Sequence, residues 1–598
     1  DGRLTFAEET KESISTTNHT NKASHIITNA LRIESGKDSR VIASNITAAA
    51  MQVDAGREFN VLSDKDSTST QQAQSKKEIG LELTLNSEEA SLFAGYWEDK
   101  YVQKQAQSQV AKSNIVAENL QVNAQNTNVV GSNITGKDIS LNAKNIRILS
   151  DTTNTQTDAY TSSIKAGIEA GIKQNLSQAV NAIVEVGGSK SGSAVAARSL
   201  QAYDAVESFA QQPVTAGVNV IYEEANTNAH SSHGKVVASS ITATNVLTLH
   251  AKNEVEIAGS EVGSANALTL NAENIHIYAT KGTYGTKNTN DSKNAQVGLY
   301  GTHIGQATVG YQENEMNTEG IYQRNSQLYA GGKATLTSTK DTTLAGANIE
   351  AKNLELQVGE DLYMQSLQER KTIEGSNTGG SISGSVIIGI PTGVSANAGQ
   401  TSGERAWVSQ TTGINANESM RVNVAGTTTL TGASITNIDK HLIDQENLEL
   451  HTKHLVVHDI KDIDTYEASS TGVGLGSNDG TPSLNSVAYT NNTKDKEQIT
   501  RSTIGGGNIH TQTMTGTLNR DTTKTQQIIK DEASNTEIYL SNKSLELLDD
   551  PNTAIDNLGQ KLQDVGQAAH VEILENLPSA SKGKDGKSDF IDIMVSKK

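Results

Sequence analysis

A five-residue pattern recurs along the chain and constrains its fold more than any other feature. The pattern reads apolar-x-apolar-x-Ala/Val and occurs at 51–55, 120–124, 139–143, 247–251, 268–272, 354–358 and 420–424. Strict alternation is typical of a strand with one buried face, because successive side chains point to opposite sides of the backbone. The intervening positions are mostly Thr, Asn, Ser, Gln and Glu, which suit a face in contact with water.

Two further short elements accompany this strand. A second alternating strand follows a corner at 59–61, 146–148, 255–257, 275–277 and 362–364, and a Ser/Asn-Ile-Thr element occurs at 44–47, 132–135, 239–242 and 433–436. Equivalent residues recur after about 20 positions, as from Ile115 to Ile134, from Ile241 to Val262 and from Ile349 to Leu367. The pattern therefore predicts an all-β fold: an elongated, right-handed parallel β-helix (β-solenoid) over most of residues 30–545, with about 20 residues per rung.

Composition supports stacked rungs and excludes some functions. Hydrophobic residues are 35% and aromatic residues 4% of the chain, which suits a thin core better than a globule. Pro occurs only five times, and the apolar residues are regularly spaced, which argues against disorder. The net charge of −19 argues against a nucleic-acid partner, because binding phosphates requires a basic surface. Cysteine is absent, so disulfides and thiolate metal sites are excluded.

The pattern divides the chain into four regions. We expect solenoid repeats over 1–150, a helical insertion over 151–230, solenoid repeats with glycine-rich hairpin inserts over 231–545, and over 546–598 a helical segment with a linker to a further C-terminal domain. The first helix is predicted from apolar residues at i, i+4 spacing: Ile164, Ile168, Ile172, Leu176, Val180 and Ile183. A second is predicted over 195–210, and a third from Leu558, Leu562, Val565, Ala569 and Ile573, ending before Pro578.

Glycine-rich alternating segments interrupt the repeat at 292–312, 377–397 and 469–476. One interpretation is a set of β-hairpins lying against the side of the solenoid. The other is a set of strands that enter a bilayer as part of a barrel, with Val297, Leu299 and Ile387 facing lipid. The sequence leaves both interpretations open. No stretch approaches the roughly 18 apolar residues of a membrane-spanning helix.

The residues that could form a reactive or metal-binding site are few and unfavourably spaced. His451, His454 and His458 are close in sequence, but His451 and His454 are expected on opposite faces of a strand. Asp459, Asp462 and Asp464 form an acidic cluster in which the last two would share a face. The run from Gly505 to Asn508 does not repeat as calcium-binding nonapeptides do. We therefore predict no catalytic, cofactor-binding or metal site and no enzymatic activity in this chain.

Several stretches resemble a known family. Residues 331–366 and 425–435 are similar to the filamentous-haemagglutinin type of two-partner secreted exoprotein. Within that family, 458–476 and 502–531 resemble the second haemagglutinin-repeat region of contact-dependent growth inhibition effectors of the CdiA type, including the run Leu518-Asn519-Arg520-Asp521. The helical insertion predicted near 160–212 has no place in the family pattern. The chain begins at Asp1 without a signal segment, so we expect it to be part of a longer protein.

The resemblance implies a function. It implies a secreted, cell-surface protein of a Gram-negative bacterium, exported by an outer-membrane two-partner secretion transporter, whose repeats help a C-terminal toxin cross the outer membrane of a neighbouring bacterium. An immunity protein would bind the toxin domain and not this chain. The alternative is a passive adhesin stalk. The toxin's activity, the target receptor and the oligomeric state are outside what the sequence indicates.

Overall fold

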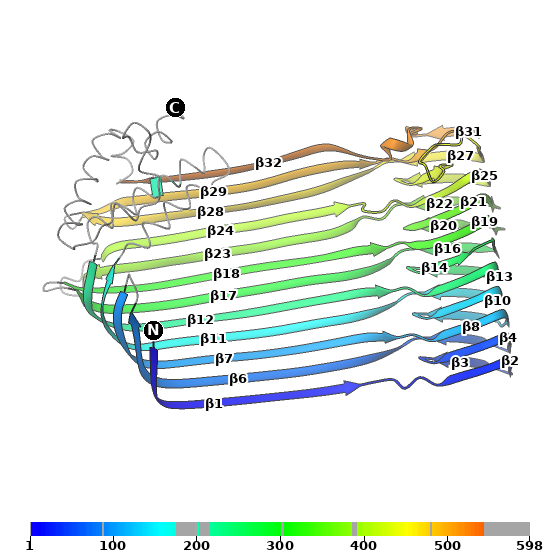
Figure 1. The fold of residues 1–598 in the computed structure, drawn as a ribbon. Helices are drawn as coiled ribbons and strands as arrows, with labels where there is room; N and C mark the ends of the chain where they lie inside the picture. The colour runs from blue at the N-terminus through cyan, green and yellow to red at the C-terminus, as the bar shows by residue number, and fades with distance from the viewer. Residues whose placement is uncertain are drawn as a thin grey trace, which may run out of the picture.

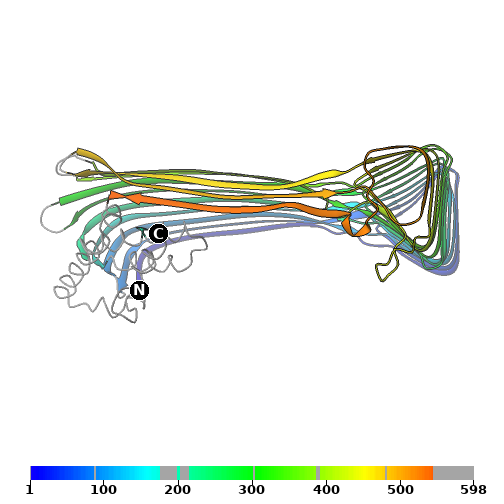
Figure 2. The same cartoon turned by 90° about the horizontal axis from the view of Figure 1, so that it is seen from above.

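The computed structural model describes residues 2–85, 89–174, 198, 200–201, 214–300, 304–385, 391–478 and 481–542. Two sheets account for nearly all of them: a closed stack of parallel strands and an open, twelve-stranded antiparallel sheet. Figure 1 shows the parallel stack at one end, with the long strands of the antiparallel sheet running away from it side by side. Seen from above, the stack is a closed loop and the second sheet is its long extension (Figure 2).

The parallel stack is built from short strands. They are β2 (His25–Ser35), β3 (Asp38–Ile42), β4 (Asn45–Ala55), β5 (Glu58–Leu62), β8 (Asn114–Asn123), β9 (Asn126–Val130), β10 (Asn133–Leu149), β13 (Ser240–Ala258), β14 (Glu261–Ser264), β15 (Ala267–Ala272), β16 (Asn274–Tyr278), β19 (Ser326–Ser338), β20 (Thr342–Ala345), β21 (Ala347–Val358), β22 (Leu362–Gln365), β25 (Gly413–Thr431), β26 (Ser434–Thr436), β27 (Leu448–His458), β30 (Thr503–Ile504) and β31 (Asn508–Thr515). One 3-10 helix, η1 (Thr522–Lys524), follows the last of them.

The antiparallel sheet, called here the hairpin sheet, has much longer strands of 16–24 residues. Its spatial order follows the chain order: β1 (Gly2–His19), β6 (Asp64–Leu85), β7 (Glu89–Ala111), β11 (Asp151–Gln174), β12 (Val214–Val237), β17 (Thr280–Tyr300), β18 (Ile304–Arg324), β23 (Glu369–Ser385), β24 (Pro391–Trp407), β28 (Ile460–Asn478), β29 (Thr481–Thr500) and β32 (Gln526–Ser541).

Columns of identical or similar apolar residues form the core of the stack. Ile46, Ile115, Ile134, Ile241 and Val262 pair in succession through parallel registers, and all are buried. The predicted rung offsets from Ile115 to Ile134 and from Ile241 to Val262 are confirmed. The offset from Ile349 to Leu367 is wrong: Ile349 pairs with Ile414, because a hairpin is inserted between these two rungs.

One corner of the rung decides where hairpins leave the stack. In alternate rungs this corner is a single residue with positive φ, namely Ala43, Gly131, Gly259, Gly346 or Gly432. In the other rungs the same corner is replaced by a hairpin: β6–β7, β11–β12, β17–β18, β23–β24 or β28–β29. Hairpins therefore recur every second rung.

This spacing explains why separate hairpins merge into one sheet. Neighbouring strands lie about 4.8 Å apart, so two rungs advance the stack by roughly 9.6 Å. A two-stranded hairpin occupies the same width in a sheet. Each hairpin consequently meets the next edge to edge, as in the continuous antiparallel pairing of β7 with β11 and of β12 with β17.

A ladder of buried hydroxyl groups joins the two sheets at this corner. Ser44, Ser113 and Ser132 each donate a backbone N–H to the hydroxyl of the next member, at 3.2 Å, ending on Ser239. The hydroxyls in turn donate to carbonyls of the preceding strand ends; Ser113 Oγ, for example, lies 2.7 Å from the Leu62 oxygen. Ser113, Ser132 and Ser239 are fully buried, so the ladder satisfies backbone groups that water does not reach.

The predicted helical insertion over 151–230 is wrong for the described residues. Residues 151–174 and 214–237 are strands β11 and β12, which pair with each other as a hairpin. The spacing of Ile164, Ile168 and Ile172 did not discriminate, because four is an even number and also returns to the same face of a strand. Leu176, Val180 and Ile183 lie outside the described residues. Arg198, Leu200 and Gln201 have helical backbone within the predicted second helix, whose other residues, like the whole of 546–598, are not described.

The glycine-rich inserts are hairpins, as predicted, but they do not lie against the stack. The described residues of 292–312 and 377–397 lie in hairpins β17–β18 and β23–β24, toward the ends remote from the stack, and 469–476 belongs to β28. We call this remote end of the hairpin sheet its distal end and the end beside the stack its root. The handedness of the stack stays a prediction.

Candidate functional site: the two faces of the hairpin sheet

One face of the distal end is apolar across the whole sheet. Register places Ile168, Val220 and Val297 directly opposite one another on β11, β12 and β17, and Val309, Ile382 and Val394 on β18, β23 and β24. These side chains are exposed or partly exposed; Val220 is 56% accessible. The exposed large apolar residues of this face, called here the apolar band, are Leu4, Ile79, Leu83, Leu85, Leu92, Ile168, Val218, Val220, Val297, Val309, Ile382, Val473, Leu475, Leu484, Ile538 and Leu540.

A continuous exposed apolar surface of this kind is unusual. Single exposed apolar residues are common on soluble proteins, but large contiguous patches mark interaction surfaces. Seven further exposed large side chains of the described sheet lie outside the band: the tyrosines Tyr222 and Tyr311 on the same face, and Phe6, Ile14, Met316, Ile528 and Ile529. The band therefore follows from the alternation of the strands and not from a general excess of apolar residues.

Outside one aromatic cluster, the opposite face of the distal end carries mostly small and polar residues. Gly80, Gly95 and Gly167 face one another on β6, β7 and β11. The same row continues through Ile221 on β12 to Gln296 and Thr308 on β17 and β18. A Cβ added at Gly80 would lie 2.3 Å from the Leu4 carbonyl oxygen, and one at Gly167 would lie 2.3 Å from that of Ala94. The glycines thus permit an approach of strands that larger residues prevent.

An aromatic cluster occupies the polar face near the N-terminal hairpins. Phe93 and Trp97 pack edge to face with ring centroids 5.0 Å apart, and Ile221 is buried with them. The Arg3 guanidinium lies 4.2 Å from the Trp97 ring centroid, and Lys165 Nζ lies 4.5 Å from that of Phe93. Arg3 also pairs with Glu78 at 2.9 Å. This cluster fixes β1, β6, β7 and β11 to one another.

Tyrosines border the apolar band on its root side. Tyr96 donates to Glu98 at 2.6 Å, Tyr222 to Glu224 at 2.9 Å and Tyr311 to Glu313 at 2.5 Å, on β7, β12 and β18. In each pair the glutamate is two residues nearer the root and on the same face. The apolar band therefore ends at a row of amphipathic aromatic side chains followed by charged ones.

Beyond this border polar side chains predominate on both faces, although Ile14, Met316, Ile528 and Ile529 are exposed there. Three side-chain hydrogen bonds join β12 to β17: Asn226 donates to Asp291, Thr227 to Asn290 and Asn228 to Thr289. Lys287 pairs with Glu315 at 2.7 Å. The root half of the sheet is thus a surface in water.

The prediction that Val297, Leu299 and Ile387 face lipid can be compared with the structure residue by residue. Val297 lies in the apolar band and is 48% exposed. Leu299 pairs with Val218 through the backbone, but its side chain is not described. Ile387 lies outside the described residues. Sequence reasoning missed the contributions of the other strands and the tyrosine border, because pairing between distant hairpins leaves no local signal.

The histidines lie on the outside of the stack. His451 stacks on His510 of the next strand at 4.3 Å, and His454 Nδ1 lies 2.7 Å from Thr513 Oγ1. Both His451 and His454 lie outside the core, contrary to the expected opposite faces, because the rung turns a corner between them at Lys453. Among the described residues, no group of three or more His, Cys, Asp or Glu side chains is arranged to hold a metal ion.

The acidic cluster is divided among structural roles at the root of β28. Asp462 is fully buried and accepts four hydrogen bonds, from Gln368 Nε2, the Val408 N–H, Gln498 Nε2 and Thr500 Oγ1, at 2.7–3.1 Å. Asp464 pairs with Lys494 at 2.7 Å, and Asp459 accepts from the Ser502 N–H at 2.9 Å. Asp462 therefore ties β28, β29 and two neighbouring segments together. Gly505–Asn508 forms the turn into β31, where the Gly506 N–H donates to Asp444.

Lys112 has a similar joining role at the root of β7. Its ammonium group donates to Asn133 Oδ1 at 3.1 Å and to the Ala238 carbonyl at 2.8 Å. Burial lowers the pKa of Lys112 because the charged form loses solvation.

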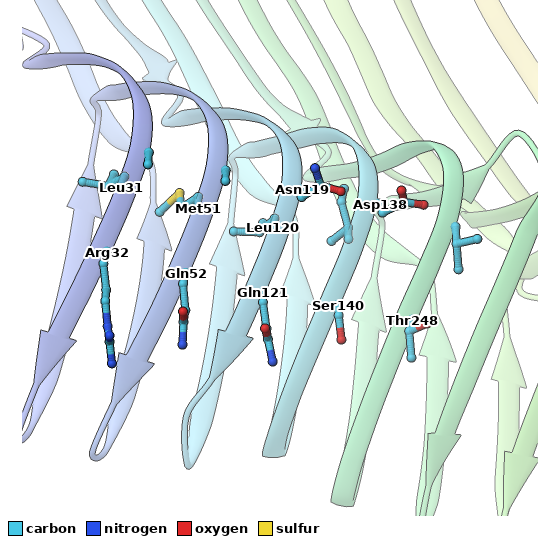
Figure 3. A pocket seen from close by; sticks show the side chains of 14 residues that line it. Leu31, Arg32, Met51, Gln52, Asn119, Leu120, Gln121, Asp138, Ser140 and Thr248 are labelled. Atoms are coloured by element: carbon cyan, nitrogen blue, oxygen red, sulfur yellow. The ribbon is translucent and has the colours of Figure 1, made fainter.

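A hollow of about 660 Å³ lies on the first rungs of the stack. Figure 3 shows its repeating lining, with Leu31, Met51 and Leu120 in one column and Arg32, Gln52, Gln121, Ser140 and Thr248 in the next. Asp138 at its edge accepts from Asn245 at 2.6 Å. The lining repeats with the rungs and brings no acid–base pair or nucleophile together, so it does not form a reactive site.

Within the described ranges there is no helix that is long and apolar enough to cross a membrane.

Comparisons with known proteins identify relatives of this chain. The model of a family described as "Hemagglutinin repeat" matches residues 6–93, 94–221 and 216–380. Similar proteins include a "Toxin CdiA" of Escherichia coli, 28% identical over 49% of this chain and 10% of the relative. A "tRNA nuclease CdiA" of Yersinia mollaretii is 29% identical over 48% of this chain and 10% of the relative. A "Deoxyribonuclease CdiA" of Dickeya dadantii is 26% identical over 44% of this chain and 8% of the relative.

The aligned part is thus about a tenth of each relative's length. No solved structure matches this chain.

Proposed function

The chain belongs to the hemagglutinin-repeat family, in a region shared with CdiA toxins, and from this premise we propose that it helps move a C-terminal toxin across the outer membrane of a neighbouring bacterium. The distal end of the hairpin sheet enters that membrane, with the apolar band toward lipid and the opposite face, with its glycines and polar residues, toward a water-filled path. The parallel stack remains outside as the support that aligns the hairpins.

The observation that carries this proposal is the separation of apolar and polar residues on the two faces of the distal sheet. Membrane-spanning strands alternate between lipid-facing apolar and lumen-facing polar residues. On β6 the band runs from Ile79 to Leu85, which is roughly 20 Å at about 3.4 Å per residue. This length is close to the apolar band of about 25 Å in outer-membrane barrels.

An open sheet needs its edges satisfied in lipid. β1 and β32 are the first and last strands of the twelve, so each has a neighbouring strand of the sheet on one side only. Unpaired N–H and C=O groups are costly in hydrocarbon, which is why membrane sheets close into barrels. In the proposal, these edges pair with further strands when the sheet inserts.

In a longer protein, this chain and the toxin domain have separate functions. The relatives are named as nucleases and toxins, and we assign such activity to a domain outside the repeats. The full protein is exported by a two-partner secretion transporter and displayed on the surface of a Gram-negative cell, and its immunity protein binds the toxin domain. The acidic chain contributes no nucleic-acid binding.

The stack is a right-handed β-helix.

Charged substitutions in the apolar band test this function. Val218→Asp, Val220→Asp and Val297→Asp combined in the full-length protein should abolish toxin delivery, because each buries a carboxylate among lipid chains. Midplane charges cost roughly 2–4 kcal/mol for Arg or Lys in barrel strands and less for Asp. Secretion and target-cell binding should persist, and growth inhibition of target cells is the measurement.

The matched control places the same charges on the stack. Ile42, Val116 and Tyr363 are comparably exposed there, and their triple Asp variant should deliver toxin normally. Delivery that survives the band substitutions would exclude insertion and favour a passive adhesin stalk.

A further inference from the structure

The border of the apolar band repeats one motif on three strands. Tyr96, Tyr222 and Tyr311 each donate a hydrogen bond to the glutamate two residues nearer the root. Tyr96 and Tyr222 both face Ala166, so they lie in one row across β7, β11 and β12. Tyr311 faces Lys293, one pleat nearer the root.

A fourth tyrosine continues the border on β29. Tyr489 faces Thr471 on β28 and Ile538 on β32, on the same side of the sheet as Val473 and Leu540. The border thus drifts toward the root from the N-terminal to the C-terminal hairpins. The border is therefore oblique to the rows of residues that pair directly across neighbouring strands. This is expected where the strands are tilted relative to a membrane surface.

The exposed side chains change from apolar to charged at this border. On its distal side lie Ile168, Val220 and Val309, all more than half exposed. On its root side Lys100 Nζ lies 2.7 Å and Lys77 Nζ 3.7 Å from Glu98. Tyrosine has an apolar ring and a polar hydroxyl, and it is enriched where membrane proteins pass from hydrocarbon to water.

We propose that the Tyr-x-Glu border is a depth stop: it lies at the lipid headgroups of the outer leaflet, so that only the distal end of the hairpin sheet enters the bilayer. This inference rests on the proposed function and adds where insertion ends. The occupant of the band is a phospholipid bilayer, and the ring of each tyrosine contacts acyl chains while its hydroxyl remains bonded to a carboxylate in water.

The depth stop holds the parallel stack away from the membrane. Tyr222 and the root end of β12 at Val237 are 15 residues apart in sequence, which is roughly 50 Å in an extended strand. The intervening residues are polar on both faces, as in the bonds of Asn226 to Asp291 and Asn228 to Thr289. This part of the sheet is therefore a spacer in water.

The absence of cysteine allows the depth to be mapped with single-cysteine variants. Val220→Cys lies distal to the border and Asn228→Cys on its root side, on the same face of the same strand. Each variant carries a polarity-sensitive fluorophore and is diluted from urea into vesicles of dilauroylphosphatidylcholine. The label at 220 should be quenched by lipid-attached quenchers and protected from iodide. The label at 228 should show the reverse.

Substitutions at the border test the motif itself. Tyr96→Ala, Tyr222→Ala and Tyr311→Ala combined should weaken vesicle binding at least tenfold, whereas Tyr329→Ala with Tyr363→Ala, two exposed tyrosines of the stack, should not change it. Glu224→Leu with Glu313→Leu extends the apolar surface by one pleat and should move a label at 226 into lipid. Far-UV circular dichroism of each variant checks that the sheet still forms.

The outcomes separate the two proposals. Protein that binds vesicles with labels at 220 and 228 equally shielded would overturn the depth stop while leaving membrane insertion intact. A border triple that binds like the unsubstituted protein would overturn it as well. A chain that shields neither label would overturn the proposed function together with this inference.

Discussion

At the scale of single residues, the joints between the two sheets depend on buried polar groups whose partners come from distant parts of the chain. Asp462 receives four donors from residues up to 94 positions away in sequence. All four partners donate, so both oxygens of the side chain must accept. Sequence reasoning placed Asp462 in an acidic cluster and could not find this role, because none of its partners is a neighbour in the sequence.

Replacement of Asp462 by Asn should destabilise the root of β28. The amide group presents donors where only acceptors fit, and buried donors left without an acceptor cost about 1–3 kcal/mol each. We expect the opening free energy of the neighbouring amides, including that of Val408, to fall by about 2–3 kcal/mol. Amide hydrogen exchange measures this change.

Asp459 provides the control for this experiment. It is exposed and accepts one bond, from the Ser502 N–H, so Asp459→Asn should change the exchange rates by much less. Equal effects of the two substitutions would contradict the role given to Asp462.

At the scale of secondary-structure elements, the corner that alternates between a single residue and a hairpin organises the molecule. Gly259 has φ of +55°, and a Cβ there would lie 2.6 Å from Thr280 Oγ1. Ala43 occupies the equivalent corner with φ of 43°. Alanine carries a conformational penalty in this region of about 1–2 kcal/mol that glycine does not.

Opposite substitutions at these two corners should have opposite effects. Gly259→Ala should destabilise its rung by about 1–2 kcal/mol or more, and Ala43→Gly should stabilise the first rungs by up to about 1 kcal/mol. Urea unfolding followed by tryptophan-independent probes such as far-UV circular dichroism measures both. A stabilising Gly259→Ala would show that the corner does not impose the left-handed conformation.

The sequence predicts elements well where their apolar period is local. The alternation at Leu120–Ala124 and Ile139–Ala143 gave the strands of the stack, and two of three rung offsets are confirmed. It failed over 151–174, where Ile164 and Ile168 fit either a helix or a strand; the pairing of β11 with β7 and β12 decides for the strand. The hairpin sheet as a whole was not predicted, because its strands are joined edge to edge by geometry and not by a motif.

At the scale of the whole molecule, the two sheets differ in how they are stabilised. The stack contains one continuous core cluster that runs from Val41 to Ile504. In the described part of the hairpin sheet, the buried apolar cluster consists of Phe93, Trp97 and Ile221. The long strands therefore depend on backbone hydrogen bonds and on their attachment to the stack.

Hydrogen exchange of the free protein should reflect this difference. Amides of the stack, such as those of Leu141 and Leu249, should exchange far more slowly than those of the hairpin sheet, such as Ser163 and Thr227, because regions with few buried apolar contacts open at lower free energy. Limited proteolysis should likewise cut the hairpins first. Uniform protection across both sheets would contradict this account.

The recurrence of one hairpin every two rungs has a consequence for how chains of this kind lengthen. A duplication of two rungs with their hairpin adds equal widths to both sheets and leaves every edge contact in place. A duplication of a single rung without a hairpin would widen the spacing between two neighbouring hairpins from roughly 4.8 Å to roughly 9.6 Å. That spacing is too wide for hydrogen bonds between the existing strands and too narrow for another two-stranded hairpin. Evolution by gene duplication is thereby restricted to even numbers of rungs, and homologues of different length should differ by whole units of this size.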